Sequence, residues 1–226
     1  MRIAVLGTGI VGRTIAEGCA RLGHEVAIGT RDPETTLTVS DQNGTGSPPF
    51  SVWHSERGEI LLKAFAEAAA GAELVVHACS GEHALDVLEL AGEENLAGKV
   101  LMDVSNALDF SGGFPPSLFV KDTDSLGEQI QRAYPAAKVV KTLNTLNASL
   151  MVAPGSLTGG EHSVFVCGND DTAKATVTEL LRGFGWRDVI DLGDISGARG
   201  VEMLLPLWLR LMNVLGTPVF NFKIVR

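Results

Sequence analysis

The sequence has few of the features that mark metalloproteins. Its 226 residues include only three cysteines, and Cys19, Cys79 and Cys167 form neither a CxxC pair nor a spacing typical of a metal site. We interpret each as a small buried apolar residue, and the odd count is typical of a reducing compartment. The five histidines are scattered, without the spacing of a catalytic triad or a ligand set. We therefore expect no metal ion.

Positive charge and long apolar runs are also scarce. The chain has only 18 lysine and arginine residues and 27 aspartate and glutamate residues, which gives a formal net charge of −9. Nucleic acid requires a basic face, so this balance argues against a nucleic-acid partner. The longest apolar run, between Met203 and Val219, is interrupted by Arg210 and two prolines, and it falls short of the ~20 residues that cross a bilayer. Because the first predicted strand begins at Arg2, we expect no signal peptide and a cytoplasmic protein without membrane contact.

What the sequence does contain is a glycine motif near its beginning. The apolar run Ile3–Leu6 predicts a buried parallel strand, which leads into Gly7-x-Gly9-x-x-Gly12 and then a helical pattern. The first glycine permits a tight turn, the second lets the backbone approach a pyrophosphate, and the third allows close packing of helix on strand. Amides of the first helical turn would face the phosphates. We therefore predict a dinucleotide-binding turn, rather than a purely structural one, made of Gly7, Thr8, Gly9, Ile10, Val11 and Gly12.

The end of the second predicted strand, Glu25–Gly29, distinguishes the two nicotinamide dinucleotides. An NAD site usually places an acidic residue about 20 residues after the glycines to bind the ribose hydroxyls. This chain instead has Thr30 and Arg31 there. The Thr30 hydroxyl can donate to a 2′-phosphate, and the Arg31 guanidinium offers a planar fork of donors. Asp32, followed by Pro33, is better suited to capping a helix. We predict NADP(H); the alternative is that Arg31 is a solvated surface charge.

Small polar residues follow three later strands, which are predicted over Glu73–Ala78, Lys99–Val104 and Lys138–Leu143. Ligands bind at the carboxyl ends of strands in open α/β sheets, so we expect these residues to line the nicotinamide. The further cofactor contacts that we predict are Cys79, Ser80, Asn106, Asn144 and Ala148. The predicted acceptor pocket consists of Asn106, Asn144, Thr145 and Leu146, and no catalytic residue is certain among them.

Two residues on these strands, His77 and Lys141, require an interpretation of their own. We interpret His77 as a packed core histidine rather than an acid or base. Lys141, followed by Asn144, invites comparison with the Lys/Asn pair of hydroxyacid dehydrogenases. Those enzymes append a long helical domain for which this chain has no room. We therefore favour the interpretation that Lys141 is a strand residue with its charge in solvent.

The remaining segments predict a second, smaller unit. The polar stretch Asp32–Pro49 is typical of a loop, which we interpret as a variable surface excursion rather than a cover over the adenosine end. The pattern restarts after Pro154, with strands over His162–Cys167 and Asp188–Leu192, helices over Thr172–Phe184 and Ala198–Leu215, and a final alternating strand over Val219–Val225. We predict an α/β protein: a Rossmann-type doubly wound parallel sheet over residues 1–153, and a small α+β C-terminal lobe over residues 154–226. The lobe would border the substrate cleft and supply a dimer contact.

Several of these features together resemble a known family, the coenzyme F420-dependent NADP oxidoreductases. They are the glycine turn with Gly29-Thr30-Arg31, the Lys141–Thr145 strand end, the Cys167–Asp171 turn, and the tail from Arg199 with Glu202, Leu205, Pro206 and Leu207. The resemblance covers nearly the whole chain and is weakest over Glu34–Gly58. It implies a homodimer, NADP on the glycine turn, and a deazaflavin ring over the nicotinamide near Asn144–Leu146 and the final strand. Where the family usually has a histidine with a proline nearby, this chain has Asn144 and Asn147.

Hydride transfer between a nicotinamide and a deazaflavin depends on close stacking more than on a protein acid. This agrees with the lack of a His/Asp or Ser/His constellation in the sequence. We expect an NADP(H)-dependent oxidoreductase with a small-molecule acceptor, either F420 or a flavin-like compound. One alternative is a reductase of a small carbonyl or imine compound, with a proton donor at Asn106, Thr145 or a water. The other is a non-catalytic NADP(H)-binding redox sensor, in which Phe110, Phe114 or Phe222 would fill the pocket.

Overall fold

The computed structural model describes residues 1–39 and 48–226, and its framework is an eight-stranded sheet. The strands follow the order β10-β9-β8-β5-β4-β1-β2-β3, and all neighbours are parallel except the antiparallel pair β8 and β9. Their bounds are β1 Arg2–Leu6, β2 Glu25–Thr30, β3 Ile60–Ala64, β4 Leu74–His77, β5 Val100–Asp103, β8 Lys138–Thr142, β9 Ser163–Gly168 and β10 Asp188–Asp191. The central strands are short apolar runs buried on both faces, which is why they form the middle of a parallel sheet.

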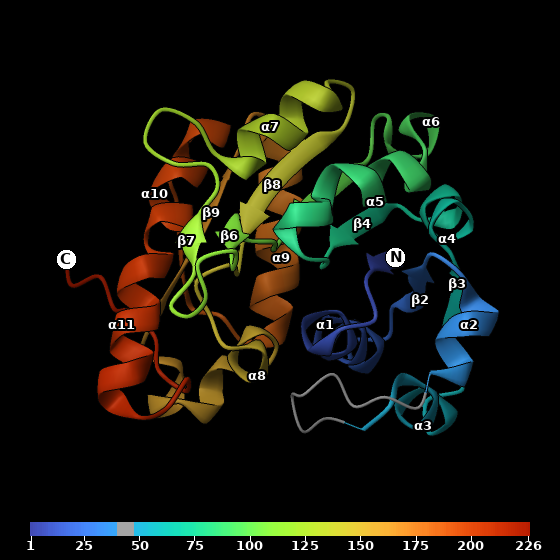
Figure 1. The fold of residues 1–226 in the computed structure, drawn as a ribbon, viewed down its shortest axis with the longest axis horizontal. Coiled ribbons are helices and arrows are strands. Elements are labelled where there is room, and N and C mark those ends of the chain that lie inside the picture. Colours follow the sequence, from blue (N-terminus) through green and yellow to red (C-terminus); the bar gives the residue numbers. More distant parts are fainter. Residues whose placement is uncertain (40–47) are drawn as a thin grey trace.

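Helices cover both faces of this sheet (Figure 1). One face carries α1 (Ile10–Arg21), α8 (Ala148–Met151) and α9 (Asp171–Phe184), with α3 (Phe50–Ser55) beside α1. The other face carries α4 (Phe65–Gly71), α5 (Ala84–Ala91), α6 (Glu93–Leu96), α7 (Leu126–Ala133) and α10 (Ala198–Met203). The remaining elements are α2 (Pro33–Thr38), α11 (Leu205–Leu215), the hairpin of β6 (Leu108–Asp109) and β7 (Ser117–Leu118), and single 3-10 turns at Gly81–His83, Pro154–Ser156, Thr158–Gly160 and Ile195–Gly197. This is the doubly wound Rossmann-type fold that the alternation of strands and helices predicts.

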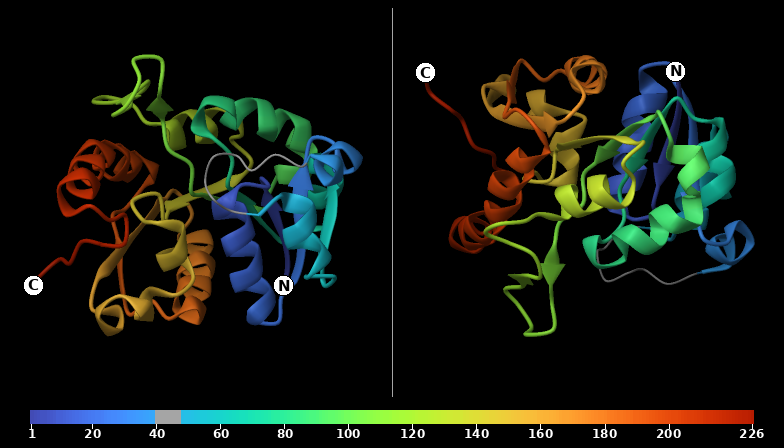
Figure 2. Two further views of the ribbon diagram at one scale, coloured as in Figure 1. Left: turned by 60° about the horizontal axis from the view of Figure 1, so that its bottom comes forward. Right: turned by 90° about the horizontal axis from the view of Figure 1, so that it is seen from above.

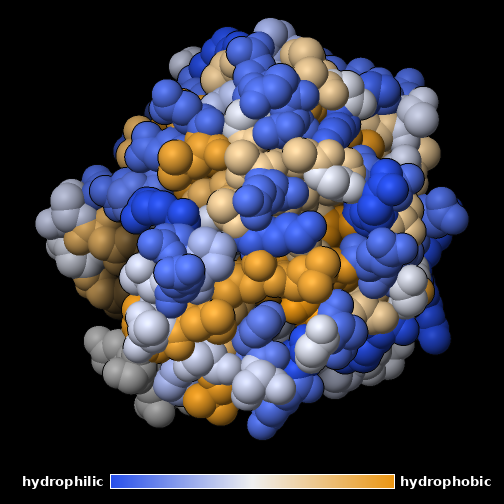
Figure 3. Space-filling model, turned by 90° about the vertical axis from the view of Figure 1, so that its right-hand side faces the viewer, coloured by the Kyte–Doolittle hydropathy of each residue, from blue (hydrophilic) through white to orange (hydrophobic). Residues whose placement is uncertain are grey.

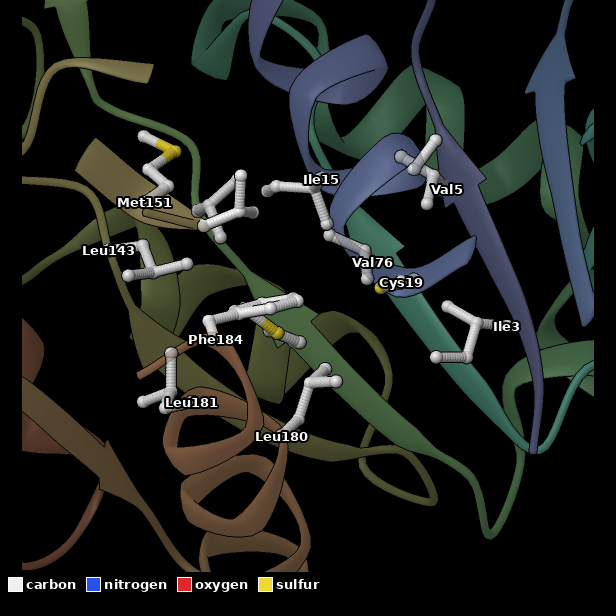
Figure 4. Close-up of a cluster of buried hydrophobic side chains, with 14 of the residues drawn as sticks. Ile3, Val5, Ile15, Cys19, Val76, Leu143, Met151, Leu180, Leu181 and Phe184 are labelled. Atoms are coloured by element: carbon white, nitrogen blue, oxygen red, sulfur yellow. The ribbon is translucent and has the colours of Figure 1, made fainter. Parts of the chain in front are cut away.

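The core on the α1 face contains residues from both the N-terminal and the C-terminal parts of the chain. Figure 4 shows Ile15 of α1 and Val76 of β4 on one side, and Leu181 and Phe184 of α9 on the other, directed into the same apolar cluster. Both helices present apolar residues at helical spacing to the sheet, so each buries one stripe. Strands β9 and β10 therefore continue the same sheet and share this core. The division into a Rossmann domain over residues 1–153 and a C-terminal lobe over residues 154–226 stays a prediction.

Three sequence-based expectations were wrong in their local structure. The predicted final strand is not a strand: the extended segment lies against β9, and the contacts that hold it there are mostly made by side chains, as when Asn221 Nδ2 donates to the Ser163 carbonyl at 2.8 Å. The predicted helix over residues 198–215 divides at Leu204 into α10 and α11. The predicted loop over residues 32–49 contains α2, which begins after the Asp32 cap, and residues 40–47 of that prediction lie outside the described residues.

The surface has two features that bear on partners. Among the described strands, β3 pairs only with β2 and so forms one edge of the sheet. Figure 3 shows a band of apolar residues, bordered by hydrophilic ones, on this side of the molecule. The β6–β7 hairpin stands out from the body of the molecule (Figure 2). Among residues 1–39 and 48–226, no helix is both long and apolar enough to cross a bilayer.

Candidate active site

The glycine turn between β1 and α1 has a geometry that only glycine allows at two of its positions. Gly7 has a φ of +126°, and a Cβ added there would lie 2.7 Å from the Ala78 carbonyl oxygen. A Cβ on Gly12 would lie 2.1 Å from the Gly7 carbonyl oxygen, so helix and turn approach each other closely. A Cβ on Gly9 would meet no atom of residues 1–39 and 48–226 within 4 Å, so the described part of the chain leaves its backbone open on that side. An elongated phosphate group therefore fits against Gly9, next to the amides that begin α1.

A groove leads from this turn to the end of β2. It has a volume of about 210 Å³. It brings together six residues of the sequence-based prediction: Gly7, Thr8, Thr30, Arg31, Cys79 and Ser80. Arg31 is exposed there and makes no hydrogen bond or ion pair with any residue that the structure describes. The sequence reasoning missed Phe65, His83 and Val87, which complete the wall from α4, the 3-10 turn Gly81–His83 and α5. No local motif distinguishes those three from ordinary helix residues.

The Thr30 hydroxyl is engaged within the protein. It lies 2.7 Å from the Thr36 hydroxyl, which itself donates to the Asp32 carbonyl at 2.7 Å. Because each hydroxyl has one hydrogen, Thr30 is the donor to Thr36 and offers its lone pairs to the groove. Asp32 caps α2 as predicted, since its side chain accepts from the Thr35 amide at 3.0 Å. Arg31 is thus the residue at this strand end whose donors bind no residue of the described part of the chain.

The Cys79 thiol lies in the groove but is not a nucleophile. It donates to the Leu6 carbonyl at 3.3 Å, and burial raises its pKa to about 11 although the nearby Arg31 charge acts in the opposite direction. The thiol consequently stays protonated near neutral pH. Cys19 and Cys167 are buried, and burial raises the pKa of each to about 12.

We expect this chemistry to appear as slow thiol labelling. At pH 8 a pKa of about 11 lowers the thiolate fraction of Cys79 by roughly two orders of magnitude relative to an ordinary cysteine. Ellman's reagent should therefore react with none of the three cysteines of the folded protein in the time in which the urea-unfolded chain is fully labelled. The rate for Cys79 should rise steadily as the pH approaches 11. Rapid labelling of one thiol per chain at pH 8 would contradict the conclusion that all three thiols stay protonated in the folded protein.

The ends of β5 and β8 are held together by two asparagines. Asn106 Nδ2 donates to the Asn144 carbonyl at 2.8 Å, and Asn144 Nδ2 donates to Asn106 Oδ1 and to the Val201 carbonyl of α10, both at 3.0 Å. Both amide hydrogens of Asn144 are therefore used inside the protein, whereas Asn106 keeps one and is partly exposed. Leu143, immediately before Asn144, has a φ of +57°, a conformation that a bulky residue adopts only when its surroundings impose it.

The other residues predicted at this strand end are buried. The side chains of Thr145, Leu146 and Ala148 are each less than a tenth exposed, and Ala148 opens α8, which Asn147 caps. They shape the end of β8 from beneath, and the partly exposed member of the predicted pocket is Asn106.

A separate cavity of about 380 Å³ lies between the β6–β7 hairpin and α11. It is lined by Phe114, Pro115, Pro116, Pro206, Leu209, Arg210 and Asn213.

Beneath the strand ends lies a buried ionic network that the sequence reasoning missed. Lys141 is completely buried, so the interpretation of a solvent-exposed charge was wrong. Its ammonium contacts Asp103 Oδ2 at 2.8 Å, the Ser105 carbonyl at 2.7 Å and Glu202 Oε1 at 2.9 Å, which uses all three of its hydrogens. Glu202 in turn accepts from the amides of Leu126 and Gly127 at the start of α7. The network thus ties β5, β8, α7 and α10 together.

His77 completes this network at β4, where it is fully buried as predicted. Its Nδ1 lies 3.0 Å from Asp103 Oδ1, which also accepts from the amide and the hydroxyl of Ser105. Burial opposes the charge of Asp103, but Lys141 and His77 outweigh it and hold the pKa of Asp103 well below its usual value. Burial likewise opposes the charge of Lys141, but Asp103 and Glu202 raise its pKa. Both groups therefore remain charged over the physiological pH range.

Known proteins resemble this chain in sequence and in fold. Residues 2–107 match the sequence model of the coenzyme F420-dependent NADP oxidoreductases. A crystal structure from Arthrobacter sp. FB24, of a protein assigned to the F420-dependent NADP reductases, is 62% identical over the whole of both chains, with a TM-score of 0.95. The F420-dependent NADP reductase of Methanocaldococcus jannaschii is 26% identical, and the match covers 93% of this chain and 92% of that protein.

A further relative is considerably longer. Metalloreductase STEAP3 of Rattus norvegicus is 30% identical over 92% of this chain, and the chain spans only 38% of the length of that protein. The whole-length match to the Arthrobacter protein settles the family, because sequence and fold agree from the glycine turn to the last residue. This chain belongs to the coenzyme F420-dependent NADP oxidoreductase family.

Proposed function

We propose that this protein binds NADP(H) across the carboxyl edge of its sheet and transfers a hydride between the nicotinamide and a deazaflavin or flavin-like acceptor. The observation that carries the proposal is the groove between the glycine turn and Arg31. In a chain with a net charge of −9, an exposed arginine without a partner among the described residues, next to the amide end of α1, favours a phosphorylated ligand.

Each end of the dinucleotide has candidate contacts on this chain. The amides of Gly9, Ile10 and Val11 would bind the pyrophosphate, and Arg31 would pair with the 2′-phosphate. Ser80 and Asn106, which follow β4 and β5, would border the nicotinamide half. The bound dinucleotide supplies the hydride chemistry, and the protein supplies orientation and exclusion of water.

Support for a flat redox acceptor comes from the groups at the strand ends. Asn106, Asn144 and Thr145 do not titrate near neutral pH, so they can position an acceptor but cannot act as general acids. Phe110 and Phe114 are 60% and 65% exposed on the hairpin, and Phe222 packs against Phe220. Phe110 and Phe114, being so exposed, do not fill a pocket at the strand ends, which argues against the non-catalytic alternative for those two residues.

The direct test offers F420, FMN, FAD and a panel of small carbonyl and imine compounds side by side, with NADPH oxidation followed at 340 nm. We expect turnover with F420 and little with the carbonyl and imine compounds. Turnover confined to a carbonyl or imine compound would replace our proposal with the alternative of a small-molecule reductase.

The Arg31→Ala variant tests the cofactor assignment. Loss of one charge-assisted pair with the 2′-phosphate should weaken NADPH binding by about 2 kcal/mol, or roughly 30-fold, and leave NADH binding nearly unchanged. Fluorescence titration of both dinucleotides measures the two dissociation constants. Arg187→Ala, at an exposed arginine outside the groove, is the matched control. Equal losses of affinity for NADPH and NADH would show that Arg31 does not bind the 2′-phosphate.

We also propose a cytoplasmic homodimer. Its support is the exposed apolar side of α11, where Leu207, Val214 and Leu215 are between 49% and 72% exposed. The three cysteines form no disulfide, which agrees with a reducing compartment. Light scattering during size-exclusion chromatography tests the dimer, because a monomer at micromolar concentration would contradict it.

A further inference from the structure

Helix α3 and the two residues before it, residues 48–55, contact the glycine turn through one arginine, Arg13 of α1. The Arg13 guanidinium lies 5.2 Å from the centre of the Phe50 ring and 5.9 Å from that of Trp53, so it is held against the aromatic side of α3. Its Nε donates to the Thr8 carbonyl at 2.7 Å, and one terminal nitrogen donates to the Pro48 carbonyl at 2.6 Å. A single planar group therefore connects the turn with the chain that enters α3.

Helix α3 is itself fixed to α1, so it can hold Arg13 in place. Phe50 and Trp53 are almost completely buried and pack on each other at 5.4 Å between ring centres. Trp53 donates its ring N–H to Glu17, one helical turn after Arg13 on α1. Arg57 lies 5.0 Å from the Trp53 ring and pairs with Glu17 at 2.7 Å. Arg13 and Glu17 thus present one face of α1 to α3.

The contact with Thr8 determines where a neighbouring amide points. The Thr8 carbonyl and the Gly9 N–H belong to one planar trans peptide, in which the two bonds point in opposite directions. A carbonyl held toward Arg13 therefore aims the Gly9 N–H in the opposite direction, away from that side chain. That N–H donates to no residue among those the structure describes.

We propose that Arg13, held by Phe50 and Trp53 of α3, is a positioning residue that orients the Thr8–Gly9 peptide for the pyrophosphate of the dinucleotide. This inference rests on the proposed NADP(H) function. It assigns residues 48–57, where the family resemblance is weakest, to the binding apparatus. The side chain acts through the peptide and not on the 2′-phosphate, so its effect is the same for both nicotinamide dinucleotides.

The test compares NADPH and NADH dissociation constants, from fluorescence titration, for the wild type, Arg13→Gln, Arg13→Lys and Phe50→Leu. We expect Arg13→Gln to weaken both dinucleotides by about tenfold and to leave their ratio unchanged. Arg13→Lys should not restore binding, because an ammonium keeps the charge but lacks the planar fork. Phe50→Leu retains Arg13 and should weaken both by about threefold, and it tests the same contact if an Arg13 variant is unstable. Arg21→Gln, at the other end of α1, is the matched control and should leave both constants within about twofold.

The outcomes separate this inference from the function on which it rests. A loss confined to NADPH would place Arg13 on the 2′-phosphate and overturn the positioning role. Arg13 variants that are folded, by thermal unfolding, and that bind both dinucleotides like the wild type would overturn it as well, while the proposed function stands. A wild type that binds neither dinucleotide would overturn the proposed function and this inference together.

Discussion

Replacement of Lys141 by Met should lower the free energy of unfolding by about 3–5 kcal/mol, because it leaves buried carboxylates without their counter-charge. The ammonium neutralises Asp103 and Glu202 and also donates to the Ser105 carbonyl, all out of contact with water. Met fills nearly the same volume, so the loss reports charge and hydrogen bonding rather than a cavity. Urea unfolding followed by circular dichroism measures the change.

The same strand offers a matched control for this variant. Lys138, at the start of β8, pairs with Asp170 at 3.1 Å, and both side chains are at least one third exposed. Lys138→Met should therefore cost no more than about 1 kcal/mol. The double variant Lys141→Met with Glu202→Gln should recover part of the stability, since it removes one of the uncompensated charges. A Lys141→Met protein as stable as the Lys138→Met control would contradict the network.

The pH dependence of this effect has a defined sign. Because the folded-state pKa of Asp103 lies below its unfolded value, its contribution to stability is present above the unfolded pKa and is lost as the pH falls through the folded pKa. Lys141 is the main charge that lowers that pKa. The stability difference between wild type and Lys141→Met should therefore be largest above about pH 4 and shrink in more acidic solution. Denaturant titrations at several pH values measure it.

Lys141 also illustrates which part of the site a sequence can predict. Its position on a strand follows from the local apolar pattern, and the structure agrees. Its burial depends on Asp103, 38 residues earlier, and on Glu202 of α10, and no local pattern brings those residues together. The prediction failed because the usual environment of a lysine is solvent, and only the tertiary fold supplies the two carboxylates that change it.

The glycine turn was predictable for the opposite reason. A strand, three glycines and a helix occupy one continuous stretch, so the backbone requirements of Gly7 and Gly12 are visible in the spacing itself. The role of Asn144 was less accessible, because its hydrogen-bond partners come from Asn106 and Val201. The final segment failed as a strand for a similar reason: alternation identifies extended chain, but the sheet partner is decided elsewhere.

Replacement of Gly9 by Ala should abolish tight NADPH binding while the fold stays intact. Gly9 has a φ of −71° and a ψ of 178°, which alanine adopts without strain, and the new Cβ would meet no atom of the described residues within 4 Å. Stability should change by less than about 1 kcal/mol, and alanine restricts the unfolded chain in favour of the fold. The methyl group would nevertheless occupy the space into which the pyrophosphate must come to reach the amides. We expect a loss of about 3 kcal/mol in NADPH affinity, or roughly 100-fold, comparable with the loss of one to two charge-assisted hydrogen bonds.

Gly12→Ala distinguishes a blocked ligand from a damaged turn. Alanine inside a helix is normally favoured over glycine by about 1 kcal/mol, but here its Cβ would lie 2.1 Å from the Gly7 carbonyl oxygen, so helix and turn must separate. Gly12→Ala should therefore lose both thermal stability and NADPH affinity, whereas Gly9→Ala loses affinity alone. Calorimetry and fluorescence titration measure the two quantities, with Gly58→Ala, also free of contacts within 4 Å, as the control. A Gly9→Ala protein that binds NADPH like the wild type would show that the pyrophosphate does not lie on this turn, because the added methyl group would block a pyrophosphate bound there.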